Sequence, residues 1–221
     1  MKQLLMLSEL SKSIWIDSVK STKVFLLNIE EISCSEFDAA YFLMSDERKK
    51  RCDAYNRETD KKLCIAADML IRRVLSEITG IDSKAVCIST TDTGKPYLEN
   101  GGCFFSVSHS GNTVAAAFST EYSVGIDIEQ LRPVKAAVAK HIFTREDMFF
   151  VFGNEIPVGV TISDPEVIER FFRVWTYKEA VVKMTGEGID DNIKNFSYSP
   201  DKCSCVISDG YCITTVVQNK F

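Results

Sequence analysis

The stretch of residues 104–129, FFSVSHSGNTVAAAFSTEYSVGIDIE, contains three short apolar runs that are separated by turn-forming residues. The runs Phe104–Ser108, Val114–Phe118 and Val124–Ile128 have the length and composition of β-strands. Glycine, asparagine, serine and threonine lie between them, as is typical of turns. We therefore predict three consecutive strands here, and we place the boundary between two halves of the chain after the second run.

Helical patterns lie on both sides of these strands. Thr59–Glu77 has apolar residues at every third or fourth position, and Asp164-Pro165 begins a helix that we expect to run to about Thr185. The order of helices and strands predicts an α+β protein in two halves, 1–121 and 122–221. The other predicted elements are strands at Val24–Ile29, Val86–Ser89, Cys205–Ile207 and Cys212–Val217, and helices at Ser45–Arg57, Val134–His141 and Arg145–Phe152.

The composition limits the classes of function. With 45% hydrophobic and 26% charged residues, the 221-residue chain is typical of a globular protein. A net charge of −5 argues against general nucleic-acid binding but leaves room for a local basic pocket that takes an anionic small ligand. No run approaches the ~18 apolar residues of a membrane span, and we recognise no signal peptide. We therefore expect a cytoplasmic protein whose eight cysteines are reduced thiols.

Two carboxylates mark a candidate metal site. Side chains alternate along a strand, so Asp127 and Glu129 of the run Gly125–Glu129 share one face. Hard cations such as Mg²⁺ take oxygen ligands and suit such a pair. The alternative is a strand end with one solvated face.

A second group lies on the last long predicted helix. Trp175, Glu179 and Lys183 are spaced four residues apart and share a helix face. Glu179 can supply another oxygen ligand or act as a base, and Lys183 can meet phosphate charge. The alternative is a surface ion pair beside a core tryptophan.

Further cations and a histidine suit a phosphate-bearing ligand. His109 lies among small polar residues at a strand end, Lys95 belongs to the turn Gly94-Lys-Pro96, and Arg48 and Arg51 flank a basic run. The sequence has neither a P-loop nor a dinucleotide-binding glycine motif. The combined set predicts an anionic, phosphate-bearing ligand that is held through Mg²⁺.

The order of these motifs resembles that of the 4′-phosphopantetheinyl transferases of the surfactin-synthetase-activating, double-length type, over about residues 45–188. The resemblance implies two similar α/β halves about a pseudo-twofold axis, with coenzyme A in the cleft between them. It implies transfer of the phosphopantetheine arm of coenzyme A to a serine of an apo acyl or peptidyl carrier protein, with release of adenosine 3′,5′-bisphosphate. The motifs that carry it are Gly94-Lys-Pro96, Phe105-Ser-Val-Ser-His-Ser-Gly111, Gly125-Ile-Asp-Ile-Glu129 and Trp175-Thr-Tyr-Lys-Glu-Ala180 with Lys183 and Gly186.

The resemblance also implies roles for individual residues. Mg²⁺, with Mn²⁺ as an alternative, would be held by Asp127, Glu129 and Glu179. Catalysis would fall to Glu179, Lys183 and His109. Coenzyme-A contacts would come from Arg48, Arg51, Lys95, Ser108, His109, Lys178 and Lys183. Either Glu146 or Asp147 matches an acidic position of the family.

Two other functions stay open at this point. One is a protein that binds coenzyme A or a carrier for regulation without turnover. The other is a Mg²⁺-dependent enzyme that cleaves a pyrophosphate with water. The family further implies a monomer, because one chain supplies both halves, whereas the carrier and its pathway are not indicated.

Overall fold

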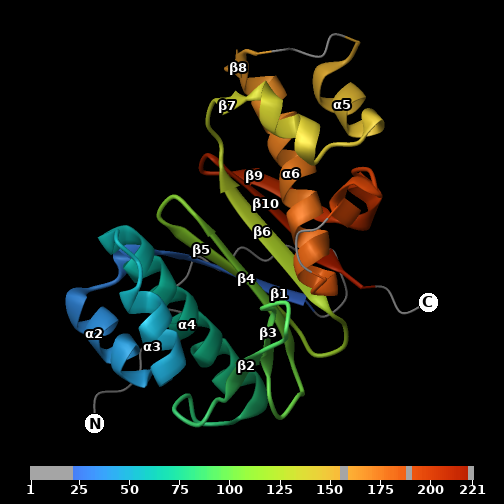
Figure 1. The fold of residues 1–221 in the computed structure, drawn as a ribbon. Coiled ribbons are helices and arrows are strands. Elements are labelled where there is room, and N and C mark those ends of the chain that lie inside the picture. The colour runs from blue at the N-terminus through green and yellow to red at the C-terminus, as the bar shows by residue number, and fades with distance from the viewer. Residues whose placement is uncertain (1–21, 155–158, 188–190, 219–221) are drawn as a thin grey trace.

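The structure, a computed structural model, describes residues 22–154, 159–187 and 191–218. Two three-stranded antiparallel sheets form its centre (Figure 1). The first sheet has the strand order β1-β5-β4 and the second the order β6-β10-β9. Their bounds are Thr22–Asn28 for β1, Phe104–Ser110 for β4, Thr113–Ser119 for β5, Val124–Gln130 for β6, Ser204–Ser208 for β9 and Tyr211–Val217 for β10.

Helices α2 (Cys34–Leu43), α3 (Asp46–Asp53) and α4 (Glu58–Thr79) gather beside the first sheet (Figure 1). The apolar stripe of α4 packs on this sheet, and the helix ends at Gly80, which adopts the left-handed conformation (φ 74°) that glycine allows. The α4 helix was predicted, whereas α2 was not. A small antiparallel pair, β2 (Ile88–Thr90) and β3 (Pro96–Leu98), follows.

In the second half, the long helix α6 (Pro165–Thr185) lies along β6 and β10. The Asp164 carboxylate accepts a hydrogen bond from the Val167 amide, and proline takes the first helical position, as the sequence predicts. Gly186 ends the helix in the left-handed conformation (φ 76°). The α5 helix (Arg145–Phe152) packs on α6.

One predicted helix is wrong. Residues 134–141 form the short strand β7 (Val134–Lys135) and the 3-10 helix η2 (Ala136–His141). The β7 strand pairs with β8 (Thr161–Ile162), and this pairing holds Val134 and Lys135 in an extended conformation, so that only the alanine-rich residues after them are helical, as a 3-10 helix. The remaining short helices are η1 (Ile29–Glu31), η3 (Asp191–Lys194) and η4 (Pro200–Lys202).

The β5 strand separates two cores. Its side chains Val114, Ala116 and Phe118 pack with α4, whereas Ala115 and Ala117 pack with residues of β6 and β10. The strand is buried along its whole length for this reason. Each half therefore contributes one sheet with one long helix, and the two sheets share an apolar layer, which confirms the predicted α+β fold in two similar halves.

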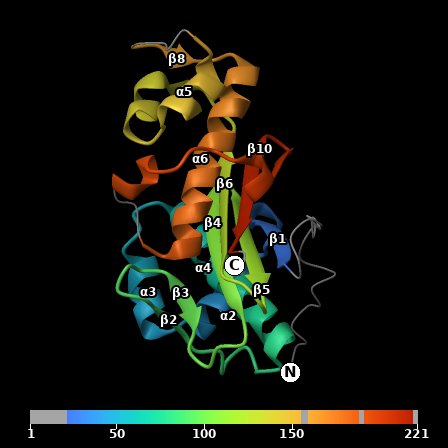
Figure 2. The same ribbon diagram turned by 90° about the vertical axis from the view of Figure 1, so that its right-hand side faces the viewer.

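The molecule is elongated, and two small groups of elements lie at its ends (Figure 2). The group of α2, α3, β2 and β3 lies at one end, and α5 with β8 lies at the other. The connection between β5 and β6, residues 120–123, crosses from one half to the other. No helix of the described segments has the length and apolar character that crossing a membrane requires.

Candidate functional site

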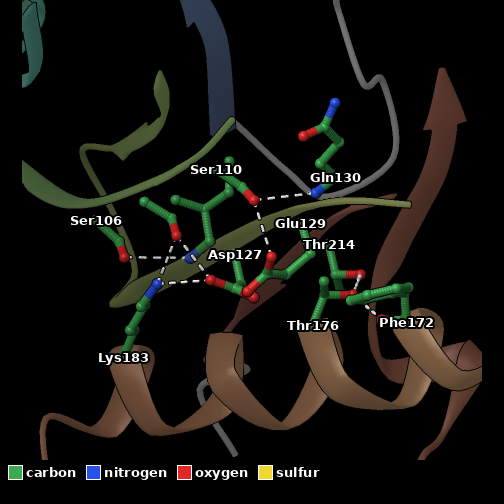
Figure 3. A network of polar contacts seen from close by, with 11 residues as sticks. Ser106, Ser110, Asp127, Glu129, Gln130, Phe172, Thr176, Lys183 and Thr214 are labelled. Carbon is green, nitrogen blue, oxygen red and sulfur yellow. Dashed lines mark hydrogen bonds and ion pairs between the residues drawn. The ribbon is translucent and has the colours of Figure 1, made fainter. Parts of the chain in front are cut away.

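Serine hydroxyl groups join the two sheets along β4 and β6, which belong to separate sheets. The Ser106 hydroxyl accepts a hydrogen bond from the Ile126 amide at 3.2 Å, and the Ser110 hydroxyl accepts one from the Gln130 amide at 3.0 Å (Figure 3). Because side chains alternate along a strand, serines at every second position of β4 all point toward β6. The junction is therefore polar at the point where the carboxylates of β6 lie.

Asp127 is the most buried carboxylate of this junction, with 4% of its surface exposed. Its Oδ1 atom accepts hydrogen bonds from the Ser108 hydroxyl and from the Lys183 ammonium, each at 2.7 Å (Figure 3). Lys183 Nζ also donates to Ser108 Oγ at 2.7 Å. The other oxygen, Oδ2, is buried and has no hydrogen-bond partner within the described part of the chain.

Glu129 and Glu179 face the same region. The Ser110 hydroxyl donates to Glu129 Oε2 at 2.8 Å. Burial raises the pKa of Glu129, and the negative charge of Asp127 raises it further. Burial and then the Asp127 charge likewise raise the pKa of Glu179. The Asp127 charge thus disfavours the charged forms of both glutamates, an effect that a cation bound among them would offset.

The donor set suits a hard cation, although the side chains are not assembled around a common point. Among the described residues, no three Asp, Glu, His or Cys side chains converge closely enough to hold a metal ion. The unpartnered Asp127 Oδ2 and the raised pKa values of Glu129 and Glu179 nevertheless fit Mg²⁺, which prefers oxygen ligands and one or two carboxylates.

A cavity of about 800 Å³ opens between the two halves at this junction. Its walls come from α3, α4, the β2–β3 hairpin, β4, β6 and α6. With the exception of Lys178, all of the predicted site residues line it: Arg48, Arg51, Lys95, Ser108, His109, Asp127, Glu129, Glu179 and Lys183. Residues that are up to 141 positions apart in the sequence, Ser45 and Gly186, therefore reach a single cavity.

His109 and Lys95 differ in how free they are to meet a ligand. The His109 side chain is exposed at the cavity, yet the surrounding walls and then the Lys183 charge lower its pKa below 6.5. Lys95 Nζ already donates to the Met184 carbonyl at 2.5 Å and to Ser123 Oγ at 3.1 Å. Lys95 therefore holds the carboxyl end of α6, in addition to lining the cavity.

Arg48 and Arg51 reach the cavity from α3, on the side of the first half. The helix begins at Ser45, whose hydroxyl accepts a hydrogen bond from the Arg48 amide at 3.2 Å. Arg51 is exposed and Arg48 is half-buried. Both guanidinium groups can therefore meet an anionic ligand without losing a buried ion pair.

The prediction that Lys178 contacts coenzyme A requires correction. Lys178 is fully buried, and its Nζ forms an ion pair with Asp147 Oδ2 at 2.9 Å and donates to the Ile193 carbonyl at 2.8 Å. Successive residues of a helix point about 100° apart, so Lys178 faces away from the cavity that Glu179 lines. Of the two acidic candidates, Asp147 takes the buried position and caps α5, whereas Glu146 is exposed.

Sequence reasoning did not single out Ser110, which orients Glu129 and joins the sheets. The pattern that could have found it is the repeat of serine at positions 106, 108 and 110. Polar residues at every second position of a strand between apolar neighbours indicate a face that meets polar groups. Asp68 and Arg72, a buried ion pair on α4 with a distance of 2.6 Å, also line the cavity and were not predicted.

Comparisons with known proteins agree with this arrangement. A family model described as the N-terminal domain of 4′-phosphopantetheinyl transferase matches residues 31–121, and the model of the 4′-phosphopantetheinyl transferase superfamily matches residues 123–209. The chain is 26% identical to the 4′-phosphopantetheinyl transferase Sfp of Bacillus subtilis (strain 168) over 167 residues, which cover 75% of this chain and 70% of that protein. It is 31% identical to the 4′-phosphopantetheinyl transferase HetI of Nostoc sp. (strain PCC 7120 / SAG 25.82 / UTEX 2576) over 158 residues, 69% of this chain and 63% of that protein. With matches to both halves and the predicted residues gathered in one cavity between them, the chain belongs to the 4′-phosphopantetheinyl transferase superfamily.

Proposed function

We propose that this protein transfers the 4′-phosphopantetheine arm of coenzyme A to a serine of an apo acyl or peptidyl carrier protein, in a Mg²⁺-dependent reaction. The serine oxygen forms a bond to the phosphorus atom that carries the pantetheine, and the bond from that phosphorus to the bridging oxygen breaks. Adenosine 3′,5′-bisphosphate leaves with that oxygen. The carrier gains the arm through a phosphodiester bond.

A single observation carries the proposal: one cavity between the halves brings three carboxylates together with lysine, histidine and arginine side chains from both halves. Carboxylates that face cations suit a ligand with a pyrophosphate and a bound metal ion. The volume of about 800 Å³ lies within the range of small-molecule and cofactor sites. We propose that the halves divide as 1–121 and 122–221, and that the protein acts as a cytoplasmic monomer, since one chain supplies both walls.

Asp127, Glu129 and Glu179 are the residues that would hold Mg²⁺. When bound, the ion would neutralise pyrophosphate charge and polarise the phosphorus that is attacked. Lys183 Nζ, now at 2.7 Å from Asp127 Oδ1, keeps part of the Asp127 charge balanced in the free protein. The Ser108 hydroxyl donates a hydrogen bond to Asp127 and accepts one from Lys183, and it thereby fixes the positions of both side chains.

Proton transfer is assigned to Glu179. Burial raises the pKa of this carboxyl group, which makes it a better proton acceptor at neutral pH than an exposed glutamate. Glu179 takes the serine proton as the oxygen–phosphorus bond forms. Lys183 and His109 donate hydrogen bonds to the phosphate oxygens on which negative charge develops. No side chain of the enzyme needs to form a covalent intermediate.

The remaining polar residues bind coenzyme A. Arg48 and Arg51 on α3 suit the 3′-phosphate, because guanidinium groups pair with phosphate oxygens in a bidentate geometry. Ser108 and Lys95 lie nearer α6 and can contact the pyrophosphate once a ligand competes for their present partners. The Lys95 ammonium is partly desolvated, which lowers its pKa and strengthens its interaction with an anion.

The test is intact-mass analysis of an apo carrier protein after incubation with this protein, coenzyme A and Mg²⁺. A gain of one phosphopantetheine that EDTA abolishes is expected. No gain with acyl, aryl and peptidyl carriers, despite measurable coenzyme-A binding, would replace the proposal with that of a binding protein without turnover. Release of adenosine 3′,5′-bisphosphate without any carrier would point to hydrolysis by water.

Matched variants on one helix test the base. Glu179→Gln should lower kcat by about 10²–10⁴-fold, because a general base contributes that much. Glu166→Gln, which changes an exposed glutamate of the same helix, should leave kcat unchanged. Asp127→Asn should abolish transfer while the circular dichroism spectrum stays that of the parent. Near-normal turnover of Asp127→Asn would contradict the metal assignment.

A further inference from the structure

Two cysteines lie close together on the second sheet, on the strands β9 and β10. Cys205 on β9 and Cys212 on β10 have their sulfur atoms 3.7 Å apart. In the strand register Cys205 is opposite Thr214, so the two cysteines are diagonal neighbours on adjacent antiparallel strands. Neither forms a disulfide in the structure. The β9 strand is the edge of its sheet and pairs with β10, so it can shift without breaking a second ladder.

The two thiols differ in environment. Cys205 is half-buried and Cys212 is fully buried. Arg173 Nη1 donates to the Cys205 sulfur at 3.4 Å. The pKa of Cys205 is lowered first by a hydrogen bond from the Cys212 thiol, and also by the Thr214 hydroxyl and the positive charge of Arg173. The hydrogen bond between the two cysteines raises the pKa of Cys212. The pair thus combines a half-buried thiol whose pKa is lowered with a fully buried thiol whose pKa is raised.

We propose that Cys205 and Cys212 form a redox-active dithiol that hydrogen peroxide converts to an intramolecular disulfide. The Cys205 thiolate attacks one peroxide oxygen, the oxygen–oxygen bond breaks, and a sulfenic acid and water form once a proton is taken up. The Cys212 sulfur then attacks the Cys205 sulfur and displaces the hydroxyl group, which leaves as a second water with the thiol proton. Two thiols are oxidised and one peroxide is reduced to two waters. The sulfur atoms must close from 3.7 Å to about 2.05 Å.

The dithiol lies next to the carboxylates of the cavity. In the register of β6 and β10, Cys212 is opposite Glu129 and Thr214 is opposite Asp127. Residues that are directly opposite share a sheet face, so the sulfur of Cys212 and the two carboxylates lie on the face that α6 covers. The Thr176 hydroxyl on α6 contacts the Thr214 hydroxyl at 2.6 Å (Figure 3). It also contacts the sulfur of Cys212 at 3.4 Å. A disulfide that pulls β9 and β10 together would therefore act on the strand that pairs with β6 and on the Thr176 contacts between β10 and α6.

The effect of the disulfide on activity rests on the proposed function, whereas its formation does not. Oxidation should lower the rate of transfer to an apo carrier by about tenfold or more, because small displacements of catalytic groups have effects of this size. Reduction with dithiothreitol should restore the rate. The Cys205→Ser variant should keep its rate under peroxide.

The experiment exposes the full chain to stoichiometric hydrogen peroxide, blocks the remaining thiols and measures the intact mass and the linked peptides. A loss of two hydrogen atoms is expected, with a link between the peptides that contain Cys205 and Cys212. Cys205→Ser and Cys212→Ser should each abolish the loss. Cys203→Ser should keep it, because burial raises the pKa of that nearby thiol to about 12 and leaves it unreactive.

The outcomes separate the two proposals. A link between other cysteines, or a loss of two hydrogens that persists in Cys205→Ser, overturns the dithiol. A Cys205–Cys212 link that leaves the transfer rate unchanged overturns its coupling to the site. If the reduced protein transfers nothing to any carrier, the proposed function fails, and the mass measurement still decides whether the dithiol forms.

Discussion

Replacing Lys178 with methionine tests whether this lysine is structural. The Lys178 ammonium is fully buried, and its ion-pair partner Asp147 has 1% of its surface exposed. Methionine has a similar length but no charge, so Lys178→Met leaves the Asp147 carboxylate buried without its cation. Removing one partner of a buried ion pair costs about 3–5 kcal/mol. We therefore expect a loss of that size in the free energy of unfolding.

The expected change in Tm follows from the chain length. For 150–250 residues, 1 kcal/mol corresponds to about 2–4 °C, so Lys178→Met should lower Tm by about 6–20 °C. Asp147 also accepts hydrogen bonds from the amides of Thr144 at 2.9 Å and Tyr198 at 2.7 Å. The double variant Lys178→Met with Asp147→Asn removes both charges and should regain part of the loss, because no unpaired buried carboxylate remains, although the single oxygen of asparagine can accept from only one of these two amides.

Urea unfolding that is followed by tryptophan fluorescence measures these differences. Lys202→Met, which changes an exposed lysine of the same half, is the control and should shift the midpoint little. At a temperature where the variant is folded, its KM for coenzyme A should equal that of the parent. A variant that keeps the parental Tm and shows a KM raised about tenfold or more, a loss of ~1.4 kcal/mol in binding, would refute the reasoning and restore Lys178 as a ligand contact.

Three further outcomes are expected. Gly125→Ala should lower the free energy of unfolding by about 3 kcal/mol or more in urea titrations, because the Cβ of the new alanine would lie 1.9 Å from the Ala180 carbonyl oxygen. An unchanged urea midpoint would contradict this packing. Ser110→Ala should weaken Mn²⁺ binding by about 10–100-fold, as measured by electron paramagnetic resonance, because Glu129 loses its 2.8 Å hydrogen bond. Ser110→Thr should restore the affinity for Mn²⁺. Equal affinity in the parent and both variants would show that the hydroxyl does not orient Glu129. The lowered pKa of His109 leaves its imidazole neutral above that pKa in the free protein, and a bound phosphate dianion raises the pKa. Binding of adenosine 3′,5′-bisphosphate near neutral pH should therefore be accompanied by uptake of a proton from the buffer. In calorimetry, the heat of binding should then vary with the ionisation enthalpy of the buffer. A heat of binding that is the same in all buffers would exclude this proton uptake.

The long elements were predictable because their signals are local. The ends of α6 follow from Asp164-Pro165 and Gly186, which fix the backbone at each terminus regardless of the rest of the chain. The α2 helix carries a comparable signal, the capping box of Ser33 and Glu36, which the sequence reading passed over. Residues 134–141 could not be assigned in this way, because the pairing of β7 with β8 depends on a segment more than 20 positions away.

The residues of the site were predictable as a set, but their individual partners were not. Neighbours in the motif Lys178-Glu179 look equivalent in sequence, yet the helix directs one side chain to the buried Asp147 and the other to the cavity. Lys95 likewise matches a ligand contact in sequence, although its ammonium holds the end of α6. Which partner a cation meets depends on where two distant elements pack, and motif spacing carries no information on this.

The position of the site follows from how the two halves join. An apolar layer alone would hold the sheets together, but it would exclude charged groups from the junction. Serines on β4 instead satisfy amides and carboxylates of β6, so a nearly buried Asp127 is tolerated there. Glu179 and Lys183 reach the same cavity from α6, whereas Arg48, Arg51 and His109 come from the first half. Neither half contains a complete set of carboxylates and phosphate-binding groups, and the chemistry therefore requires both halves of the chain to be packed together.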